Sequence, residues 1–150
     1  MYASITLGAE SLCRKDEINF SSCSVGKKTA SFCVSRGANT ELAYIQYRFG
    51  TSGKVKLVVP KDPKNSKGVF VNSMYTDGIG SEMRLSFKNG IYSYIFFNID
   101  SWQQGDSFSR GIYVLKNSVL IKTLPCKNPT SDQTLIPEGL IGNENFLFFK

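Results

Sequence analysis

Two pairs of carboxylates are spaced closely enough to serve as a general acid and a general base. Asp77 and Glu82 form one pair, and Asp100 and Asp106 form the other. Glycoside hydrolases use two such carboxylates on either side of the bond they cleave. Each pair, however, lies in or beside a predicted turn, where aspartate is common because its side chain hydrogen-bonds to the backbone. We therefore expect these residues to shape turns, and we predict no catalytic residue and no enzymatic activity.

The chain of 150 residues contains no histidine. It thus lacks the imidazole base of a nucleophilic triad and the histidine ligand of the usual zinc sites. Gly78-Ile79-Gly80 is not followed by a third glycine, and it precedes a predicted strand rather than the helix that a phosphate cradle requires. We expect no cofactor and no metal.

Two loops carry residue types that are typical of protein recognition. Ile79 lies between two glycines, and Trp102, the single tryptophan, lies in a hydrophilic stretch. Large rigid side chains of this kind dominate interface energetics. Alternatively, Ile79 tucks under its own loop and the Trp102 indole closes one end of the fold. The candidate partner-binding residues are Tyr75, Asp77, Ile79, Trp102 and Asp106.

A second candidate site is a basic patch between residues 51 and 68. This segment contains five lysines and one acidic residue, Asp62, and therefore has a net charge of +4. The whole chain has 18 Lys and Arg and 12 Asp and Glu, a net charge of +6. Such a patch favours an acidic partner. Alternatively, the lysines protect an edge strand from pairing with other sheets. The patch consists of Lys54, Lys56, Lys61, Lys64 and Lys67.

The composition is that of one globular domain, with 41% hydrophobic and 20% charged residues. A chain of this length buries roughly two thirds of its unfolded surface. Residues 1–12 are predicted to be the remnant of a signal peptide or a flexible N-terminus, residues 13–126 a β domain, and residues 127–150 an extension that packs on it. No segment reaches the roughly 18 apolar residues of a membrane span.

Short runs of Val, Ile, Tyr and Phe alternate with turn residues, and no window shows a helical period. The sequence therefore predicts an all-β fold, a single antiparallel barrel or sandwich of about 8–10 strands with disulfide staples. The strands are expected at 17–25, 29–35, 43–49, 55–59, 69–75, 82–88, 91–98, 111–116 and 119–124, with an additional one at 145–149.

Three hairpins can be given a register. A two-residue turn at Asn89-Gly90 places Phe87 opposite Tyr92, on a face that is apolar or aromatic throughout. A second turn, at Asn117-Ser118, sets Leu115 against Leu120 and Val114 against Ile121. In the first hairpin, a three-residue loop at 26–28 brings together the apolar set Ile18, Phe20, Phe32 and Val34.

Four cysteines, an even number with no CxxC spacing, indicate two disulfides and hence an oxidising compartment. In the register chosen for the first hairpin, Cys23 and Cys33 share the face opposite the apolar set. We expect Cys13 to pair with one of them and Cys126 with the other. The polar run 127–132 is predicted to be a linker, and the apolar end of the chain either packs back on the fold or forms a homodimer contact.

A series of short motifs is distributed over residues 13–126: Phe20-x-x-Cys23, Gly26-Lys27-Lys28, Cys33, Tyr47-Arg48-Phe49-Gly50, Gly78-Ile79-Gly80, Lys88-Asn89-Gly90-x-Tyr92-x-Tyr94, Gly111-Ile112-Tyr113-Val114 and Cys126. In these motifs the sequence resembles a group of small, exported, uncharacterised bacterial proteins. The resemblance implies a periplasmic, disulfide-bonded β domain without a known activity. A weaker likeness, of type only, links the chain to periplasmic lysozyme inhibitors and to immunity proteins that block cell-wall toxins, although a charge of +6 disfavours a basic lysozyme as the partner.

These observations favour a periplasmic or secreted, non-enzymatic protein that inhibits or neutralises a protein partner, such as a secreted toxin or hydrolase. The alternative is a binder of a small ligand or an anionic envelope polymer, through the barrel interior or the lysine patch. A nucleic-acid partner is disfavoured by the predicted disulfides and by the lack of a nucleic-acid-binding motif.

Overall fold

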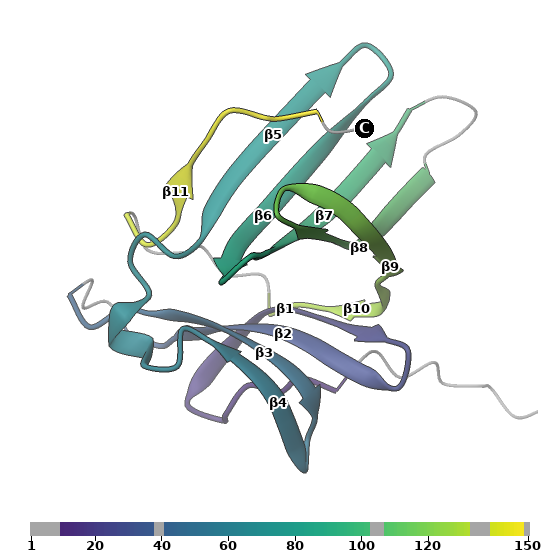
Figure 1. Ribbon diagram of the computed structural model, residues 1–150. Helices are drawn as coiled ribbons and strands as arrows, with labels where there is room; N and C mark the ends of the chain where they lie inside the picture. Colours follow the sequence, from purple (N-terminus) through teal and green to yellow (C-terminus); the bar gives the residue numbers. More distant parts are fainter. Residues whose placement is uncertain (1–9, 38–40, 103–106, 133–138, 149–150) are drawn as a thin grey trace, which may run out of the picture.

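The computed structural model describes residues 10–37, 41–102, 107–132 and 139–148 and arranges them in two β-sheets, one above the other in Figure 1. The prediction of a nearly all-β fold with two disulfides is confirmed. Among the described residues, no helix has the length and hydropathy that crossing a membrane requires.

The first sheet has five strands in the order β10-β1-β2-β3-β4, and the second has six in the order β11-β5-β6-β7-β8-β9. The five-stranded sheet contains β1 (Glu17–Val25), β2 (Lys28–Ser35), β3 (Ile45–Thr51), β4 (Lys54–Val59) and β10 (Lys127–Thr130). The six-stranded sheet contains β5 (Val71–Asp77), β6 (Gly80–Asn89), β7 (Tyr92–Ser101), β8 (Ser107–Lys116), β9 (Val119–Pro125) and β11 (Gly142–Asn143). A short 3-10 helix, η1 (Pro63–Asn65), follows β4.

Each of the nine main predicted strands overlaps an observed one, but the C-terminal part of the chain differs from prediction. Where composition predicts a linker, β10 pairs antiparallel with β1. An edge strand needs only backbone hydrogen bonds on one side, so polar side chains and Pro129 are tolerated there. No strand forms over residues 145–148; instead β11 pairs with β5, and this pair is parallel.

The β6–β7 hairpin keeps the predicted apolar face but shifts its register by two residues. Asn89 pairs with Tyr92, so the turn residues are Gly90 and Ile91, and Phe87 lies opposite Tyr94 rather than Tyr92. Within this turn Gly90 has the positive φ, of 64°, and Asn89 does not. A type I′ turn at Asn89-Gly90 needs positive φ at both residues, which explains why that register is not adopted.

The β8–β9 hairpin follows its prediction at the turn and departs from it farther along. Asn117 and Ser118 both have positive φ, and Leu115 lies opposite Leu120 as expected. A bulge between Val114 and Leu115 then places Lys122, not Ile121, opposite Val114.

The β1–β2 hairpin has a two-residue turn, since Val25 pairs with Lys28, and not the predicted three-residue loop. A bulge between Asn19 and Ser21 shifts the register instead, and Ile18 and Phe20 both pack against the core together with Phe32 and Val34. The predicted apolar set is therefore correct. A consequence is that Cys23, opposite Ala30, and Cys33, next to Phe32, lie on opposite faces of the sheet and not on one face.

Aromatic rings from both sheets form the core between them. Phe32 of β2 packs against Phe96 of β7, with ring centroids 4.6 Å apart, and Tyr47 of β3 packs against Phe87 of β6 at 4.8 Å. Phe70, just before β5, is fully buried against the Phe87 ring. Burial raises the pKa of the Tyr47 hydroxyl, which is held in this apolar environment.

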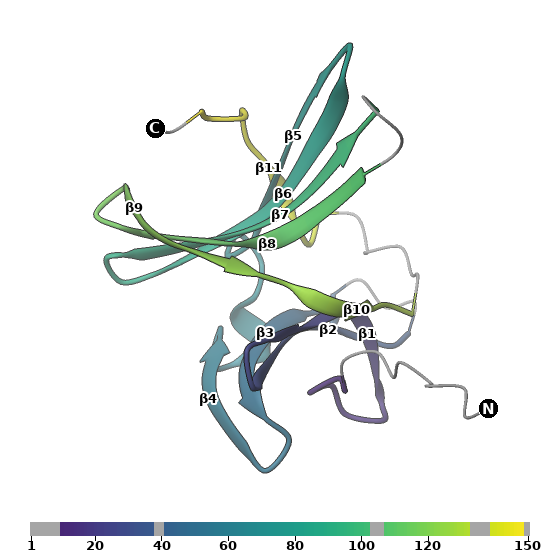
Figure 2. The ribbon, with the colours of Figure 1, turned by 90° about the vertical axis from the view of Figure 1, so that its right-hand side faces the viewer.

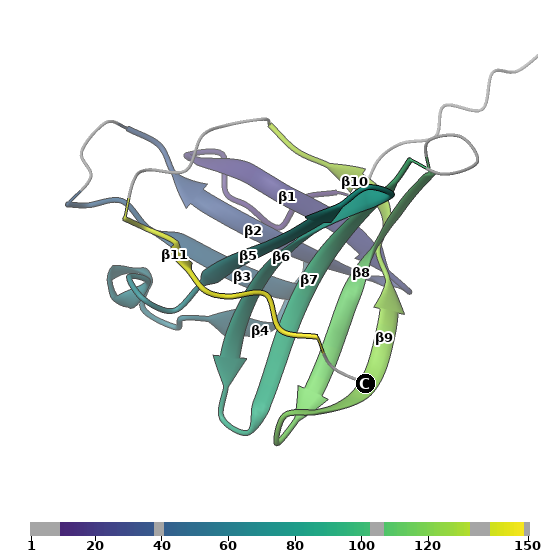
Figure 3. The ribbon, with the colours of Figure 1, turned by 90° about the horizontal axis from the view of Figure 1, so that it is seen from above.

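The six-stranded sheet extends beyond the part that the core covers (Figure 2), and its strands cross those of the other sheet steeply (Figure 3). The cross-strand pair Met74 and Met83 lies on the same face as Leu85, which packs against the core. Nevertheless, Met74 is 61% exposed and Met83 48% exposed. The end of the six-stranded sheet at the β5–β6 turn is therefore open on its inner face.

The two disulfides lie on opposite faces of the five-stranded sheet. Cys23 is bonded to Cys126, which lies between β9 and β10, where the chain passes from one sheet to the other. Cys13 is bonded to Cys33 and holds the segment before β1 against the outer face. This pairing agrees with the expectation that Cys13 and Cys126 take one partner each.

A buried ion pair lies on the same outer face as the Cys13–Cys33 disulfide. Arg48 of β3 makes two hydrogen bonds to the Glu17 carboxylate, of 2.6 and 2.8 Å, and both side chains are almost fully buried. Burial alone would raise the pKa of Glu17, but hydrogen bonds from Arg48, the Arg14 backbone and the Tyr44 hydroxyl, together with the Arg48 charge, bring this pKa below its usual value of 4.5. Both charged groups of this buried pair therefore have hydrogen-bond partners.

We predict that the two disulfides contribute unequally to stability. The Cys23–Cys126 bond closes a loop with a separation of 103 residues and the Cys13–Cys33 bond one of 20. Chain-entropy arguments assign about 4.7 kcal/mol to the longer loop and roughly 3 kcal/mol to the shorter. In urea denaturation, the double variant C23A/C126A should therefore lose about 1–2 kcal/mol more than C13A/C33A. An equal loss in the two variants would contradict this ranking.

We also predict that Glu17→Gln leaves Arg48 as an uncompensated buried charge and lowers the free energy of unfolding by about 3–5 kcal/mol. Because the folded-state pKa of Glu17 is lowered, its stabilisation is present above about pH 4.5 and is lost as the pH falls through the folded pKa. The difference between wild type and E17Q, measured by urea denaturation, should therefore shrink in acid. Asp16→Asn, an exposed neighbour, is the control and should change stability little. A difference between wild type and E17Q that stays constant with pH would contradict this role.

Candidate functional site

The open end of the six-stranded sheet brings together two of the candidate binding residues. The Trp102 backbone N–H, just after β7, donates a hydrogen bond of 2.8 Å to the Ile79 carbonyl in the β5–β6 turn. Both side chains are about half exposed, Ile79 at 51% and Trp102 at 49%. The interpretations in which Ile79 tucks under its loop and Trp102 closes the fold are therefore not supported. We call the surface formed by residues 77–81 and 100–102 the sheet tip.

Two residues determine the backbone geometry of the sheet tip. The Asp77 carboxylate accepts hydrogen bonds from the backbone N–H groups of Ile79, at 2.9 Å, and Gly80, at 3.1 Å. Gly80 lies so close to β7 that a Cβ atom there would collide with the carbonyl oxygen of Asp100. Asp77 thus shapes the turn, and Gly80 allows the two strands to approach each other.

The charge at this end of the sheet is opposite to that of the whole chain. Residues 75–82 and 98–102 contain Asp77, Glu82 and Asp100 but no lysine or arginine. Glu82 is neutralised by Arg84, whose guanidinium lies 2.8 Å from the carboxylate. The sheet tip is therefore apolar and acidic, although the protein is basic.

The C-terminal segment crosses the outer face of the six-stranded sheet (Figure 3), and the Tyr75 side chain of β5 contacts it there. The Tyr75 ring packs against Phe146, at 5.5 Å, and Phe148, at 4.9 Å. The Arg84 guanidinium lies 3.9 Å from the centre of the Phe146 ring and donates a hydrogen bond of 2.7 Å to the Leu147 carbonyl. The structure thus groups Tyr75 with the C-terminal segment and not with Ile79 and Trp102. Asp106 lies outside the described residues.

Both carboxylates of the first predicted pair, Asp77 and Glu82, have structural partners. Asp77 is used by its own turn, and Glu82 is held by Arg84 and by the Tyr113 hydroxyl at 3.4 Å. Burial, and then the negative charge of Glu82, raise the pKa of Tyr113. Within the described part of the chain, no three His, Cys, Asp or Glu residues are grouped as metal ligands would be.

The lysine patch lies on the other sheet. Lys54 and Lys56 belong to β4, which is the free edge of the five-stranded sheet, and Lys61, Lys64 and Lys67 follow it. All five lysines are exposed. Figure 1 shows β4 at the bottom and the β5–β6 turn at the opposite end of the molecule. The two candidate sites are therefore separate surfaces.

Lysines from neighbouring hairpins also crowd together at this edge. The side chain of Lys28 lies close to that of Lys56, and contact with that second ammonium group lowers the pKa of Lys28. The Lys28 ammonium also lies 5.5 Å from the centre of the Phe49 ring. This arrangement fits an edge strand protected by charge, the alternative weighed for the patch.

Two features were missed by reasoning from the sequence. One is the buried ion pair of Glu17 and Arg48. A charged residue between two aromatic residues, in Tyr47-Arg48-Phe49, was the sequence signal that could have indicated it. The other is a cavity between the two sheets, whose lining comes from strands far apart in the chain and which has no local sequence signal.

Searches of protein-family models, curated proteins and solved structures find no significant match to this chain. The resemblance to exported bacterial β proteins and the weaker likeness to inhibitors therefore stay predictions.

We predict that Gly80→Ala disturbs the sheet tip whereas Gly78→Ala does not. At Gly78 a Cβ atom would have no neighbour within 4 Å, while at Gly80 the backbone must shift. The expected loss for G80A is about 1–3 kcal/mol, the usual range for a destabilising substitution, and for G78A within about 0.5 kcal/mol. Thermal unfolding measures both, and amide hydrogen exchange at Trp102 should accelerate in G80A alone. Equal behaviour of the two variants would contradict the close packing of β6 on β7.

Proposed function

We propose that the protein is a non-enzymatic binding protein of the bacterial periplasm. Built on a sandwich-like scaffold, it inhibits or neutralises a protein partner by seating its sheet tip in that partner's cleft. The observation that carries the proposal is the pairing of Ile79 and Trp102, half exposed and joined by a backbone hydrogen bond at the uncovered end of a sheet. A rigid projection with an apolar anchor loses little entropy on binding.

The charge distribution suggests the chemistry of the partner. The sheet tip carries Asp77 and Asp100 and no cation, so it is complementary to an apolar cleft lined by basic groups. The lysines that make the protein basic lie on the far edge of the other sheet. Because exposed charges are screened over about 8–10 Å at physiological salt, contact at the sheet tip depends on the local charge rather than on the total of +6.

This local charge answers the objection that a protein of charge +6 is steered away from basic lysozyme-like enzymes. Such an enzyme would meet the acidic sheet tip and not the lysine patch. A cell-wall-degrading hydrolase or toxin therefore stays the proposed class of partner. The two disulfides are consistent with the oxidising, exported location that such a role requires.

An acidic partner at the lysine patch is the competing proposal. It is supported by the density of positive charge between residues 51 and 68, a segment that contains five lysines and a single acidic residue, Asp62. Lys54 and Lys56, however, lie on a free sheet edge. Protection of that edge against pairing with other sheets explains their presence without a binding role. We therefore rank this surface second.

The test is capture of the partner from an envelope extract by the immobilised protein, followed by titration of the purified partner. Trp102→Ala and Ile79→Ser should each weaken binding by roughly 30-fold, as expected for interface hot spots of about 2 kcal/mol. The double variant K54Q/K56Q is the matched control on the lysine patch and should change the affinity by less than about threefold, a rim-charge effect. Loss of binding in the lysine variant, with binding retained in the variants of the sheet tip, would overturn the proposal in favour of the competing surface.

A further inference from the structure

The two internal methionines of the chain are neighbours across two strands. Apart from Met1, the methionines are Met74 and Met83. Met74 of β5 lies directly opposite Met83 of β6. Side chains in this relation share one face of the sheet, with Cβ atoms about 4.5–5.5 Å apart. Because a methionine side chain has three rotatable bonds, both sulfur atoms can reach a single ion between them.

Core packing does not explain why methionine occupies these two positions. Both side chains are exposed, and neither belongs to the buried core or to the side chains packed against it. Strands favour β-branched and aromatic residues, and methionine is useful mainly as a filler of irregular gaps in a core. At this pair, both thioether groups are instead accessible to a ligand from solvent.

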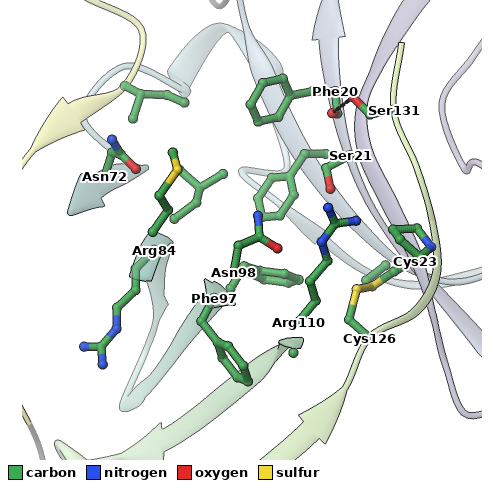
Figure 4. Close-up of a pocket in the computed structure, with 18 of the residues that line it drawn as sticks. Phe20, Ser21, Cys23, Asn72, Arg84, Phe97, Asn98, Arg110, Cys126 and Ser131 are labelled. Carbon is green, nitrogen blue, oxygen red and sulfur yellow. Dashed lines mark hydrogen bonds between the residues drawn. A yellow bond between two sulfur atoms is a disulfide. The ribbon is translucent and has the colours of Figure 1, made fainter. Parts of the chain in front are cut away.

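The methionine pair borders the half-open space between the two sheets. Met83 contributes to the lining of this space, and Asn98, directly opposite Met83 on β7, points its amide into it (Figure 4). Neighbouring positions on the same face carry Asp100 and Arg110, whose charges are opposite. An ion at the two sulfur atoms therefore has an amide group beside it, and the charges nearby balance.

No stronger soft ligand competes with the two thioethers. The chain has no histidine, and its four cysteines are all bonded in the two disulfides. Thioether sulfur is a soft ligand that selects Cu(I), whereas Zn²⁺ is bound mainly by imidazole and thiolate, and Ca²⁺ and Mg²⁺ by oxygen. The ligand type at this pair therefore selects a soft monovalent cation.

We propose that Met74 and Met83 together bind one soft monovalent cation, of which Cu(I) is the biological candidate. The two sulfur atoms hold the ion, and the amide oxygen of Asn98 is the candidate third ligand. The ion is bound without a change of oxidation state, so this is a binding site and not a redox centre. It does not rest on the proposed function, since neither methionine belongs to the sheet tip.

The test uses Ag⁺, which shares the charge and softness of Cu(I) and needs no reductant that would endanger the disulfides. In calorimetric titration with silver nitrate, in a buffer without chloride, we expect one ion to bind per chain. Two linked ligands bind more tightly than either alone by roughly 100-fold or more. Met74→Leu and Met83→Leu, which conserve side-chain volume, should therefore each weaken binding by about that factor. Ile121→Leu, at another exposed strand position, is the control and should leave binding unchanged.

Nuclear magnetic resonance of the wild-type protein with ¹³C-labelled methionine methyl groups gives a second measurement that needs no variant protein. The Met74 and Met83 signals should shift together and saturate at one equivalent of Ag⁺, whereas Zn²⁺ should leave them in place. A competition titration with Cu(I) and a chromogenic chelator should rank wild type, M74L and M83L in the same order as Ag⁺ does.

Two results would overturn the proposal. In the first, two silver ions bind per chain and each single variant removes one of them, so that the methionines bind separately. In the second, the double variant M74L/M83L binds Ag⁺ with the affinity of the wild type, so that the ion binds elsewhere.

Discussion

The aromatic contact between the two sheets is the interaction on which the other features of this protein depend. Phe32 and Tyr47 of one sheet meet Phe87 and Phe96 of the other, and the Cys23–Cys126 bond holds the sheets together where the chain crosses between them. The contact covers only part of the longer sheet. Beyond it the sheets diverge, which leaves a cavity at the border and an open sheet end farther out.

Described segments near each end of the chain, residues 10–16 and 144–148, lie on the outer faces of the two sheets. The segment before β1 is bound to the five-stranded sheet by the Cys13–Cys33 bond and by the Leu12 carbonyl, which accepts a hydrogen bond from Arg48. The C-terminal segment is bound to the six-stranded sheet through Phe146 and Arg84. The sheet tip combines exposed apolar side chains with a backbone that is held by hydrogen bonds. For this reason we assign recognition to Ile79 and Trp102.

Much of the fold could be predicted because strands with alternating apolar residues leave a local signal. The strand positions and the apolar set around Phe32 come from such patterns. Ile79 and Trp102 were candidates for a different reason, because each is a large apolar residue in a loop of glycine or polar residues, and the sequence left open whether they are exposed. The bulge near Phe20, the polar strand β10 and the pairing of Glu17 with Arg48 depend on contacts between distant segments. The cavity around Arg110 requires two sheets to be placed in space, which residue patterns do not specify. Residue patterns thus suggested the sheet tip as a candidate surface and gave no sign of the cavity between the sheets.

The central claim is that the open end of the six-stranded sheet is the recognition surface. Hydrogen–deuterium exchange of the protein with and without its captured partner tests it most directly. The account predicts that the complex protects backbone amides in residues 77–82 and 98–102 and leaves residues 54–67 unchanged. Protection of residues 54–67, with the sheet tip exchanging as in the free protein, would contradict it.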